Sequence, residues 1–468
     1  MYKAQIDAYF DDPDIQKQLV DAVARLVNIR SVREAPLPGM PFGAGPAKAL
    51  EEGLALCQAL GFATRNVDGY VGTADLNGGD TLLHMLGHLD VVGEGKGWST
   101  DPYRMTEKDG MLYGRGVADD KGPLVAALFA MKAVRDLELP ISHNVRLIMG
   151  TDEESGSEDI AYYYARNPYA PLTFSPDADF PVINIEKGSY KPTFTKAWGD
   201  ECALPRVARL SGGFRINVVP PEADALVEGI SLITVGALVQ SAAEETGAAF
   251  TLTAEGSGTR IHCGGRNAHA ANPEDGCNAI TALLTLLDRL PLADCESTAA
   301  VKALCALFPH GDTAGTALGI AQADESSGPL TLAFTLLELN EHGFSGRFDS
   351  RVPLCADAAN CKAAAVSAFQ SHGITAEGDM GAPHHTPAES PFVQTLLDCY
   401  EAYTGVQGAQ PIAIGGGTYV HDIPGGVAYG CCMPGFDPKM HGADEHTPVA
   451  DLVTACKIFT EAIAALCD

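Results

Sequence analysis

The chain has 468 residues, with 60 acidic against 31 basic side chains and a formal net charge of −29 at pH 7. This length exceeds what one hydrophobic core usually supports, so we expect more than one domain. The negative charge argues against a nucleic-acid or anionic-membrane partner, because both would repel the chain. No apolar run approaches the ~20 residues that span a bilayer and the N-terminus lacks a signal-peptide pattern, which predicts a cytoplasmic protein.

The first part of the chain alternates helical and strand patterns. Apolar residues at helical spacing predict helices over 14–30 and 46–60. The apolar runs 81–89 and 144–151 predict buried strands, and the segment 122–139 between them is typical of a helix. Strand, helix and strand in this order indicate a parallel sheet that is flanked by helices.

After about residue 185 the pattern changes to one typical of antiparallel strands and intervening helices. Strands are predicted at 209–219, 250–256, 259–265 and 330–352, and helical stretches near 222–246 and 277–290. From about residue 384 the alternation of helix and strand returns, with helices over 391–404 and 448–466. We therefore predict an α/β fold in which a discontinuous domain with a mixed, mostly parallel sheet is interrupted by an α+β domain with antiparallel sheets.

Five short motifs carry acidic and histidine residues in one order along the chain. They are GHLD at 87–90, GRGVADDKG at 114–122, DEESGS at 152–157, SPDAD at 175–179 and MHGADE at 440–445. Each motif has an ordinary explanation when taken alone, for example a core position for His88 or a helix N-cap at Asp119 or Asp120. The ordered set instead predicts a site for two metal ions.

The donors in these motifs are two imidazoles, one carboxylate that can bridge two cations and two terminal carboxylates. Three protein ligands for each of two metals, with water completing each site, are typical of catalytic rather than structural sites. Nitrogen and oxygen donors without thiolate suit Zn²⁺, although Mn²⁺ or Co²⁺ would also be accepted.

Two of the motifs follow predicted strands. His88 and Asp90 share one face at the carboxyl end of the strand 81–89, where open α/β sheets bind ligands, and the Asp90 carboxylate could hold the second ring nitrogen of His88. Glu153 and Glu154 are adjacent, so both can enter one pocket only on an irregular turn. One of them can then bind metal while the other serves as general base.

The motifs resemble those of the dinuclear zinc peptidase family that includes carboxypeptidase G, aminoacylase and succinyl-diaminopimelate desuccinylase. Within it the chain looks most like the PepV-type dipeptidases, which are related to carnosinases. The segments that match this branch are GHLDVV, GRGVADDKGP, SPDADFPV, GGFRINVVP and IGGGTYV. The resemblance spans nearly the full length and implies a catalytic domain at 1–189 and 384–468 and an inserted lid domain at 190–383.

The resemblance also implies the roles of individual residues in the catalytic domain. One metal would be bound by His88, Asp119 and Asp177, and the other by Asp119, Glu154 and His441. Asp90 would orient His88. Glu153 would take a proton from the bridging water and deliver it to the leaving amine. The peptide bond between Asp119 and Asp120 is expected to be cis.

Residues of the lid would complete the site in the family's pattern. His269, in GGRNAHAANPEDGCNA, would stabilise the tetrahedral oxyanion. Asn217 and Arg351 would bind the terminal carboxylate of the substrate, a task that suits a forked guanidinium. Gly416 and Gly417 belong to a glycine-rich turn that the substrate backbone would approach closely.

These observations predict a cytoplasmic metallo-dipeptidase that acts on short peptides with a free amino terminus. A deacylase or desuccinylase of N-acyl amino acids would use the same five motifs, and a binding protein on the same fold is a third reading. The sequence reads VHD at 420–422, where the resemblance leads us to expect a basic residue. The insert is about twice the size of the single lid through which relatives dimerise, so we expect a monomer.

Overall fold

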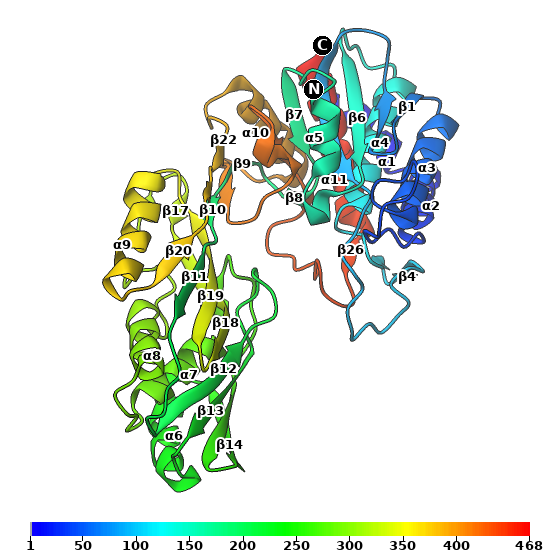
Figure 1. Cartoon of the computed structure of the whole chain (residues 1–468). Coiled ribbons are helices and arrows are strands. Elements are labelled where there is room, and N and C mark those ends of the chain that lie inside the picture. The colour runs from blue at the N-terminus through cyan, green and yellow to red at the C-terminus, as the bar shows by residue number, and fades with distance from the viewer. Residues whose placement is uncertain (1) are drawn as a thin grey trace. The chain divides into compact units, whose positions relative to one another are not determined.

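The computed structural model describes residues 2–468, which separate into two compact units (Figure 1). Unit 1 holds the chain up to Ile185 together with His384–Ile412 and Gly417–Asp468, and unit 2 holds Glu186–Pro383 and Ala413–Gly416. The insert predicted at 190–383 therefore begins at Glu186 and also takes a short returning segment. The boundary falls here because β9 (Ile183–Glu186) pairs in the sheet of unit 1, whereas β10 (Gly188–Tyr190) already pairs in that of unit 2.

Unit 1 is built on a mixed sheet. Its strand order is β1 (Ala63–Val67), β2 (Val71–Asp75), β6 (Asn144–Gly150), β3 (Thr81–His88), β7 (Leu172–Ser175), β24 (Val427–Ala428), β9 and β22 (His384–His385), with β23 (Ile412–Ile414) pairing with β9. The central strands β6, β3, β7 and β24 run parallel, while β1, β2 and β9 pair antiparallel with their neighbours. The mixed α/β sheet expected from the sequence is confirmed.

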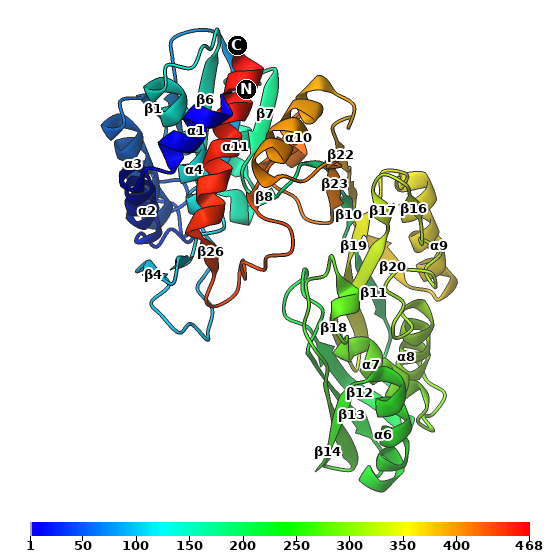
Figure 2. The ribbon, with the colours of Figure 1, turned by 180° about the vertical axis from the view of Figure 1, so that it is seen from behind.

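Helices cover both faces of this sheet. They are α1 (Lys3–Phe10), α2 (Pro13–Val27), α3 (Ala44–Ala59), α4 (Lys121–Asp136), α5 (Glu158–Tyr164), α10 (Pro391–Thr404) and α11 (Val449–Cys467). Figures 1 and 2 show α4 and α11 on one face and α5 on the other. Every residue of α4 from Lys121 to Val134 is buried, which explains its apolar sequence, because a helix enclosed on all sides needs apolar residues all round.

Two small sheets of unit 1 bring distant motifs together. The first contains β4 (Thr106–Lys108), β5 (Met111–Tyr113) and β26 (His446–Pro448), and the second contains β8 (Ala178–Asp179) and β25 (Cys431–Cys432). In the first, His446 pairs with Tyr113. The end of the MHGADE motif therefore lies beside the start of the GRGVADDKG motif.

Unit 2 contains an antiparallel sheet with helices along it. The strand order is β14 (Ala249–Glu255), β15 (Gly258–Gly264), β13 (Glu222–Glu228), β12 (Arg206–Gly212), β18 (Thr331–Asn340), β19 (Gly343–Val352), β10 and β21 (Met380–Gly381), with β11 (Thr193–Ala197) pairing with β19 and with β20 (Thr375–Glu377). Figures 1 and 2 show α6 (Leu232–Thr246), α7 (Ala279–Asp288) and α8 (Glu296–Leu307) along one face. The short hairpin of β16 (Ala323–Asp324) and β17 (Gly328–Pro329) and the helix α9 (Ala363–Ser371) complete the unit.

The helix predicted over 222–246 is wrong in its first part. Residues Glu222–Glu228 form β13, and the helix begins at Leu232. Ala223, Ala225 and Val227 are buried while their neighbours are more exposed, so the burial has the period of two that a strand requires. Alanine is the strongest helix former, and its repetition in this segment concealed the strand.

Two further sequence features are clear in the structure. All 13 cysteines lie within residues 2–468 and are free thiols. Within residues 2–468, none of the helices has the length and apolar character that a membrane crossing requires.

Candidate metal centre

The motif residues of unit 1 gather at the carboxyl ends of its parallel strands. His88 is the last residue of β3, and Asp177 follows β7. Glu153 and Glu154 lie in a single 3₁₀ turn, η1 (Glu153–Ser155), directly after β6. This is the irregular turn that the adjacent glutamates required. Because β3 runs parallel to both β6 and β7, their carboxyl ends meet at one edge of the sheet.

Asp119 lies between the two histidines. Its Oδ1 is 3.0 Å from His88 Nε2, and its Oδ2 is 2.9 Å from His441 Nε2. The bond between Asp119 and Asp120 is cis, as the resemblance implied. Each oxygen of this carboxylate thus faces a different imidazole, which is the arrangement needed for a bridging ligand.

The loop that carries Asp119 depends on a close backbone approach. A Cβ atom on Gly122 would lie 2.1 Å from the carbonyl oxygen of Val117, so only glycine permits this turn into α4. Neither aspartate of the motif caps the helix, because Asp120 is the N-cap residue but makes no capping hydrogen bond with its side chain. The capping explanation for these two residues therefore does not hold.

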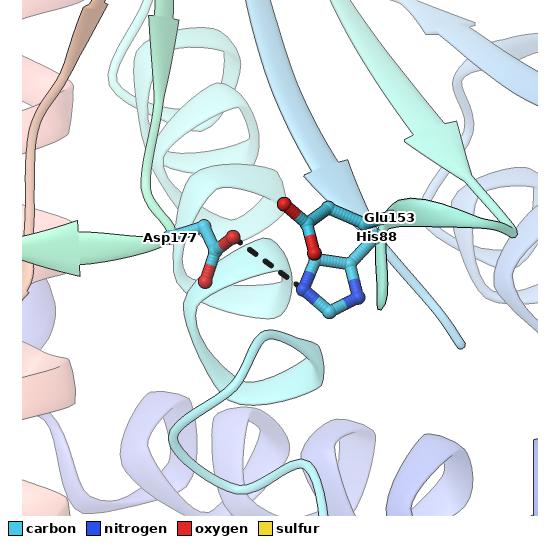
Figure 3. A group of neighbouring side chains, drawn as sticks. All are labelled: His88, Glu153 and Asp177. Carbon is cyan, nitrogen blue, oxygen red and sulfur yellow. Dashed lines mark ion pairs between the residues drawn. The ribbon is translucent and has the colours of Figure 1, made fainter. Parts of the chain in front are cut away.

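The remaining carboxylates complete two groups of donors. Asp177 Oδ2 is 3.4 Å from His88 Nε2, and Glu154 Oε2 is 3.2 Å from His441 Nε2. Donor atoms of His88, Asp119 and Glu154 lie within 4.8 Å of one another, as do those of His88, Glu153 and Asp177. Figure 3 shows the Glu153 carboxylate beside the His88 ring, with Asp177 facing it. Glu153 is thus close enough to act on a molecule bound between these groups.

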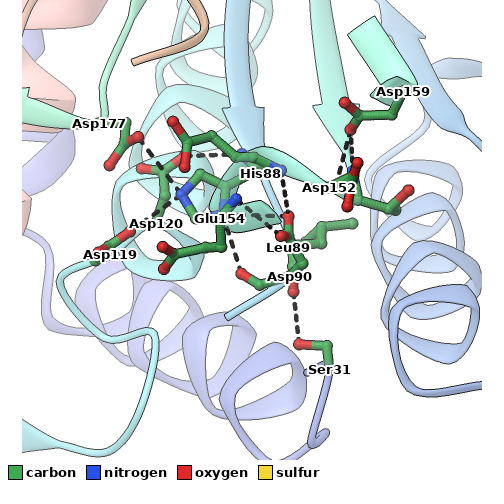
Figure 4. Close-up of polar contacts among 12 residues, drawn as sticks. Ser31, His88, Leu89, Asp90, Asp119, Asp120, Asp152, Glu154, Asp159 and Asp177 are labelled. Carbon is green, nitrogen blue, oxygen red and sulfur yellow. Dashed lines mark hydrogen bonds and ion pairs between the residues drawn. The ribbon is translucent and has the colours of Figure 1, made fainter. Parts of the chain in front are cut away.

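Asp90 holds both the imidazole and the glutamate turn. Its backbone oxygen lies 3.0 Å from His88 Nδ1, closer than its carboxylate at 3.5 Å, and this contact leaves Nε2 free to face Asp119. The two carboxylate oxygens each accept a hydrogen bond at 3.1 Å, one from the backbone N–H of Glu153 and the other from that of Glu154 (Figure 4). A contact between Asp90 and His88 was predicted from the sequence, but the hydrogen bonds from Glu153 and Glu154 to Asp90 were not.

Asp120 and Asp159 also support the site, although the sequence indicated only helix capping for Asp120 and no role for Asp159. Asp120 Oδ2 accepts a hydrogen bond from the backbone N–H of His88 at 3.0 Å. Asp159, at the start of α5, accepts hydrogen bonds from the backbone N–H of Asp152 and from the Tyr419 hydroxyl. Both carboxylates lie in or next to the acidic motifs, but only the folded chain shows which backbone groups they bind.

The centre gathers more buried anionic groups than its histidines can balance. Burial raises the pKa of Asp177 to about 6, despite the opposing effect of His88, and it also raises the pKa of Glu153 and Glu154. Burial opposes ionisation of Asp119 as well, yet hydrogen bonds from His441 and His88 hold its pKa below the usual range.

These donors fit divalent cations. Burying several ionised carboxylates this close together destabilises the folded protein unless positive charge neutralises them. Among residues 2–468, Glu154 Oε1 is buried without a hydrogen-bond partner, so it is available to bind a cation. The donor set of nitrogen and oxygen atoms suits Zn²⁺, Mn²⁺ or Co²⁺.

The residues predicted to bind substrate lie mostly in unit 2, where several of them come together. Asn217 accepts a hydrogen bond from the backbone N–H of Ala270, next to His269. Arg351 donates to both carboxylate oxygens of Asp349, at 2.9 and 3.0 Å, and to the backbone oxygen of Gly415. Gly416 follows in the same unit, whereas Gly417 belongs to unit 1.

Comparison with known proteins identifies the family. Residues 84–465 match the family described as peptidase family M20/M25/M40. The putative dipeptidase YtjP of Bacillus subtilis (strain 168) is 34% identical over 455 residues, covering 96% of this chain and 97% of the relative. The Beta-Ala-Xaa dipeptidase of Lactobacillus delbrueckii subsp. lactis is 31% identical over 427 residues, with 90% of each chain covered.

A solved structure has a similar fold. Human carnosine dipeptidase 1 has a TM-score of 0.59 with 15% identity, and the match covers 100% of this chain and 99% of that chain. The family match over residues 84–465 and the relative with 34% identity show that the protein belongs to the peptidase family M20/M25/M40. The family recognised from the five motifs and the prediction of a peptide hydrolase are both confirmed.

Proposed function

We propose that this peptidase is a dipeptidase whose active centre holds two divalent metal ions, and that these are Zn²⁺ bound by the donor set described above. The observation that carries the proposal is the position of Asp119, with one carboxylate oxygen toward His88 and the other toward His441. His88, Asp119 and Asp177 would hold one cation, and Asp119, Glu154 and His441 the other. Such cations polarise the scissile carbonyl group and activate the attacking water.

Glu153 is the proposed general base. Its carboxylate lies within 4.8 Å of donor atoms of His88 and Asp177, while Asp90 fixes its backbone. In this position Glu153 would accept a proton from the attacking water and deliver it to the amine that leaves. The neighbouring Glu154 would be committed to metal binding, which divides the two roles between adjacent carboxylates.

Unit 2 is proposed to be the lid that recognises the substrate. In this proposal His269 donates a hydrogen bond to the oxyanion, Asn217 and Arg351 bind the terminal carboxylate, and Gly416 and Gly417 contact the substrate backbone. Arg351 is suited to its task because Asp349 orients it and three of the five N–H groups of a guanidinium are used within unit 2. Within residues 2–468 the other two N–H groups of Arg351 make no hydrogen bond that would keep them from a ligand.

Replacement of Arg351 by lysine is expected to raise KM for dipeptides about tenfold or more, because a hydrogen bond to a charged group contributes about 1.5–3 kcal/mol. The measurement is steady-state kinetics on one dipeptide. Arg209→Lys serves as the matched control, since the Arg209 side chain is 66% exposed on the same unit. An unchanged KM in Arg351→Lys would remove this residue from the substrate site.

The substrate class is tested with a panel of free and N-blocked compounds. A dipeptidase should hydrolyse dipeptides with a free amino terminus, β-alanyl dipeptides included, at least ~10-fold faster than their N-acetyl or N-succinyl counterparts, because the blocked compounds lose a charged hydrogen bond. Preference for the N-acyl compounds would identify a deacylase or desuccinylase instead. Purified protein that binds no metal and hydrolyses neither class would point to a binding protein.

The enzyme is also proposed to be a monomer. Unit 2 spans Glu186–Pro383, so it is large enough to replace the second lid that dimeric relatives would supply. Light scattering should give the mass of one chain, 49.0 kDa.

A further inference from the structure

Arg115 and Glu445 form a fully buried ion pair in unit 1. Arg115 Nη1 lies 2.6 Å from Glu445 Oε2, and the side chains are 1% and 0% exposed. The two residues are far apart in sequence, and the pairing of β26 with β5 brings them together. A buried pair of charges contributes little net stability compared with apolar packing, so its presence calls for another explanation.

Glu445 binds the loop that ends in Asp119. Its Oε1 accepts hydrogen bonds from three backbone N–H groups, those of Gly116 at 2.9 Å, Ala118 at 3.0 Å and Asp119 at 3.2 Å. One carboxylate oxygen thus fixes the backbone of the residue whose side chain faces both histidines.

Arg115 binds the segment that carries His441. Its Nη2 donates to the backbone oxygen of Gly442 at 3.0 Å and lies 3.4 Å from that of Gly93. The segment has a demanding backbone, since His441 has φ of 62°, in the left-handed region that most residues avoid. A conformation of this kind persists only where surrounding contacts hold it, and the guanidinium supplies one next to the histidine.

We propose that the Arg115–Glu445 pair is a positioning unit that sets His441 against Asp119 and so determines the affinity of the cation position between them. Glu445 holds one loop, Arg115 holds the other, and the ion pair joins the two. The His88 position depends on this pair only through the shared Asp119, because β3, Asp90 and Asp120 hold His88 itself. The inference rests on the two-metal part of the proposed function and names residues outside the proposed ligand set.

The test is metal binding by Glu445→Gln, measured by competition with a chromophoric chelator for Zn²⁺ and by titration with Co²⁺ followed by absorption spectroscopy. One of the two affinities should fall about 10- to 100-fold, as is usual when a residue that orients a ligand is changed, while the other, which shares only Asp119 with the pair, should fall less. The Co²⁺ spectrum should change with the weakened position. Two affinities equal to those of the unaltered protein would overturn the proposal.

Metal binding is also measured for a control variant, for a second variant of the pair and for the unaltered protein. Glu461→Gln is the matched control, because Glu461 is a buried glutamate of α11 whose contacts with Tyr2 and Tyr403 lie away from the metal centre. Arg115→Lys keeps the charge but loses the planar guanidinium, which binds Glu445 through one nitrogen and Gly442 through the other. It should therefore weaken the same cation position even if Glu445→Gln does not fold. Normal affinities in Arg115→Lys would contradict the proposal. An unaltered protein that binds fewer than two cations would instead refute the two-metal function itself.

Discussion

Replacement of Glu153 by glutamine is expected to lower kcat at least ~100-fold while both metal ions remain bound. A general base contributes about 10²- to 10⁴-fold, and the amide of glutamine cannot accept the proton of the attacking water. The Asp90 carboxylate binds the backbone of residue 153 and not its side chain, so the turn should persist in the variant. Steady-state kinetics on a dipeptide and metal analysis of the same sample check both parts.

The metal analysis matters because donor atoms of Glu153, His88 and Asp177 lie within 4.8 Å of one another. Loss of a metal ion from Glu153→Gln would show that Glu153 is a metal ligand. Near-normal turnover with both metal ions retained would show that Glu153 is not the general base. Glu158→Gln is the matched control. This glutamate begins α5, its side chain is 65% exposed, and it pairs with Arg33. Its replacement should leave turnover within about twofold, since exposed ion pairs contribute little.

The sequence was sufficient to predict the frame of unit 1 because its signals are local. The apolar runs 81–89 and 144–151 became β3 and β6, and the helix between them became α4. Polar residues directly after such strands lie at the carboxyl edge of the sheet, so the sequence also predicted that His88 and the adjacent glutamates would share one site. The period of the apolar residues and the positions of the motifs were enough for this step.

The supporting contacts could not be predicted, because they join backbone groups whose positions depend on irregular segments. The Asp90 carboxylate binds the turn at Glu153 and Glu154, whereas the residue spacing had suggested a contact with His88 alone. Arg115 and Glu445 lie 330 positions apart, and neither motif contains a pattern that predicts their pairing. Sequence patterns report the secondary structure of a segment but not the long-range contacts of its loops.

Replacement of Asp119 by asparagine is expected to remove at least one metal ion and to lower kcat/KM about 1000-fold or more. An asparagine amide has a single carbonyl oxygen, so it cannot place one oxygen toward His88 and a second toward His441, as the carboxylate does at 3.0 and 2.9 Å. Polarisation by a bound cation contributes several kcal/mol, and each 1.36 kcal/mol is tenfold in rate. Metal stoichiometry and dipeptide hydrolysis measure the two effects.

Asp109→Asn provides the comparison for this variant. Asp109 is exposed in the turn between β4 and β5 and has φ of 53°, a conformation that asparagine adopts readily. This control should keep two metal ions and full activity, so any loss in Asp119→Asn reflects the bridging position and not the general loss of an acidic group. If Asp119→Asn kept both cations with unchanged affinity, the bridge would have to be assigned to another carboxylate. Glu153 would then be the first candidate, because it is the remaining acidic side chain beside His88 and Asp177.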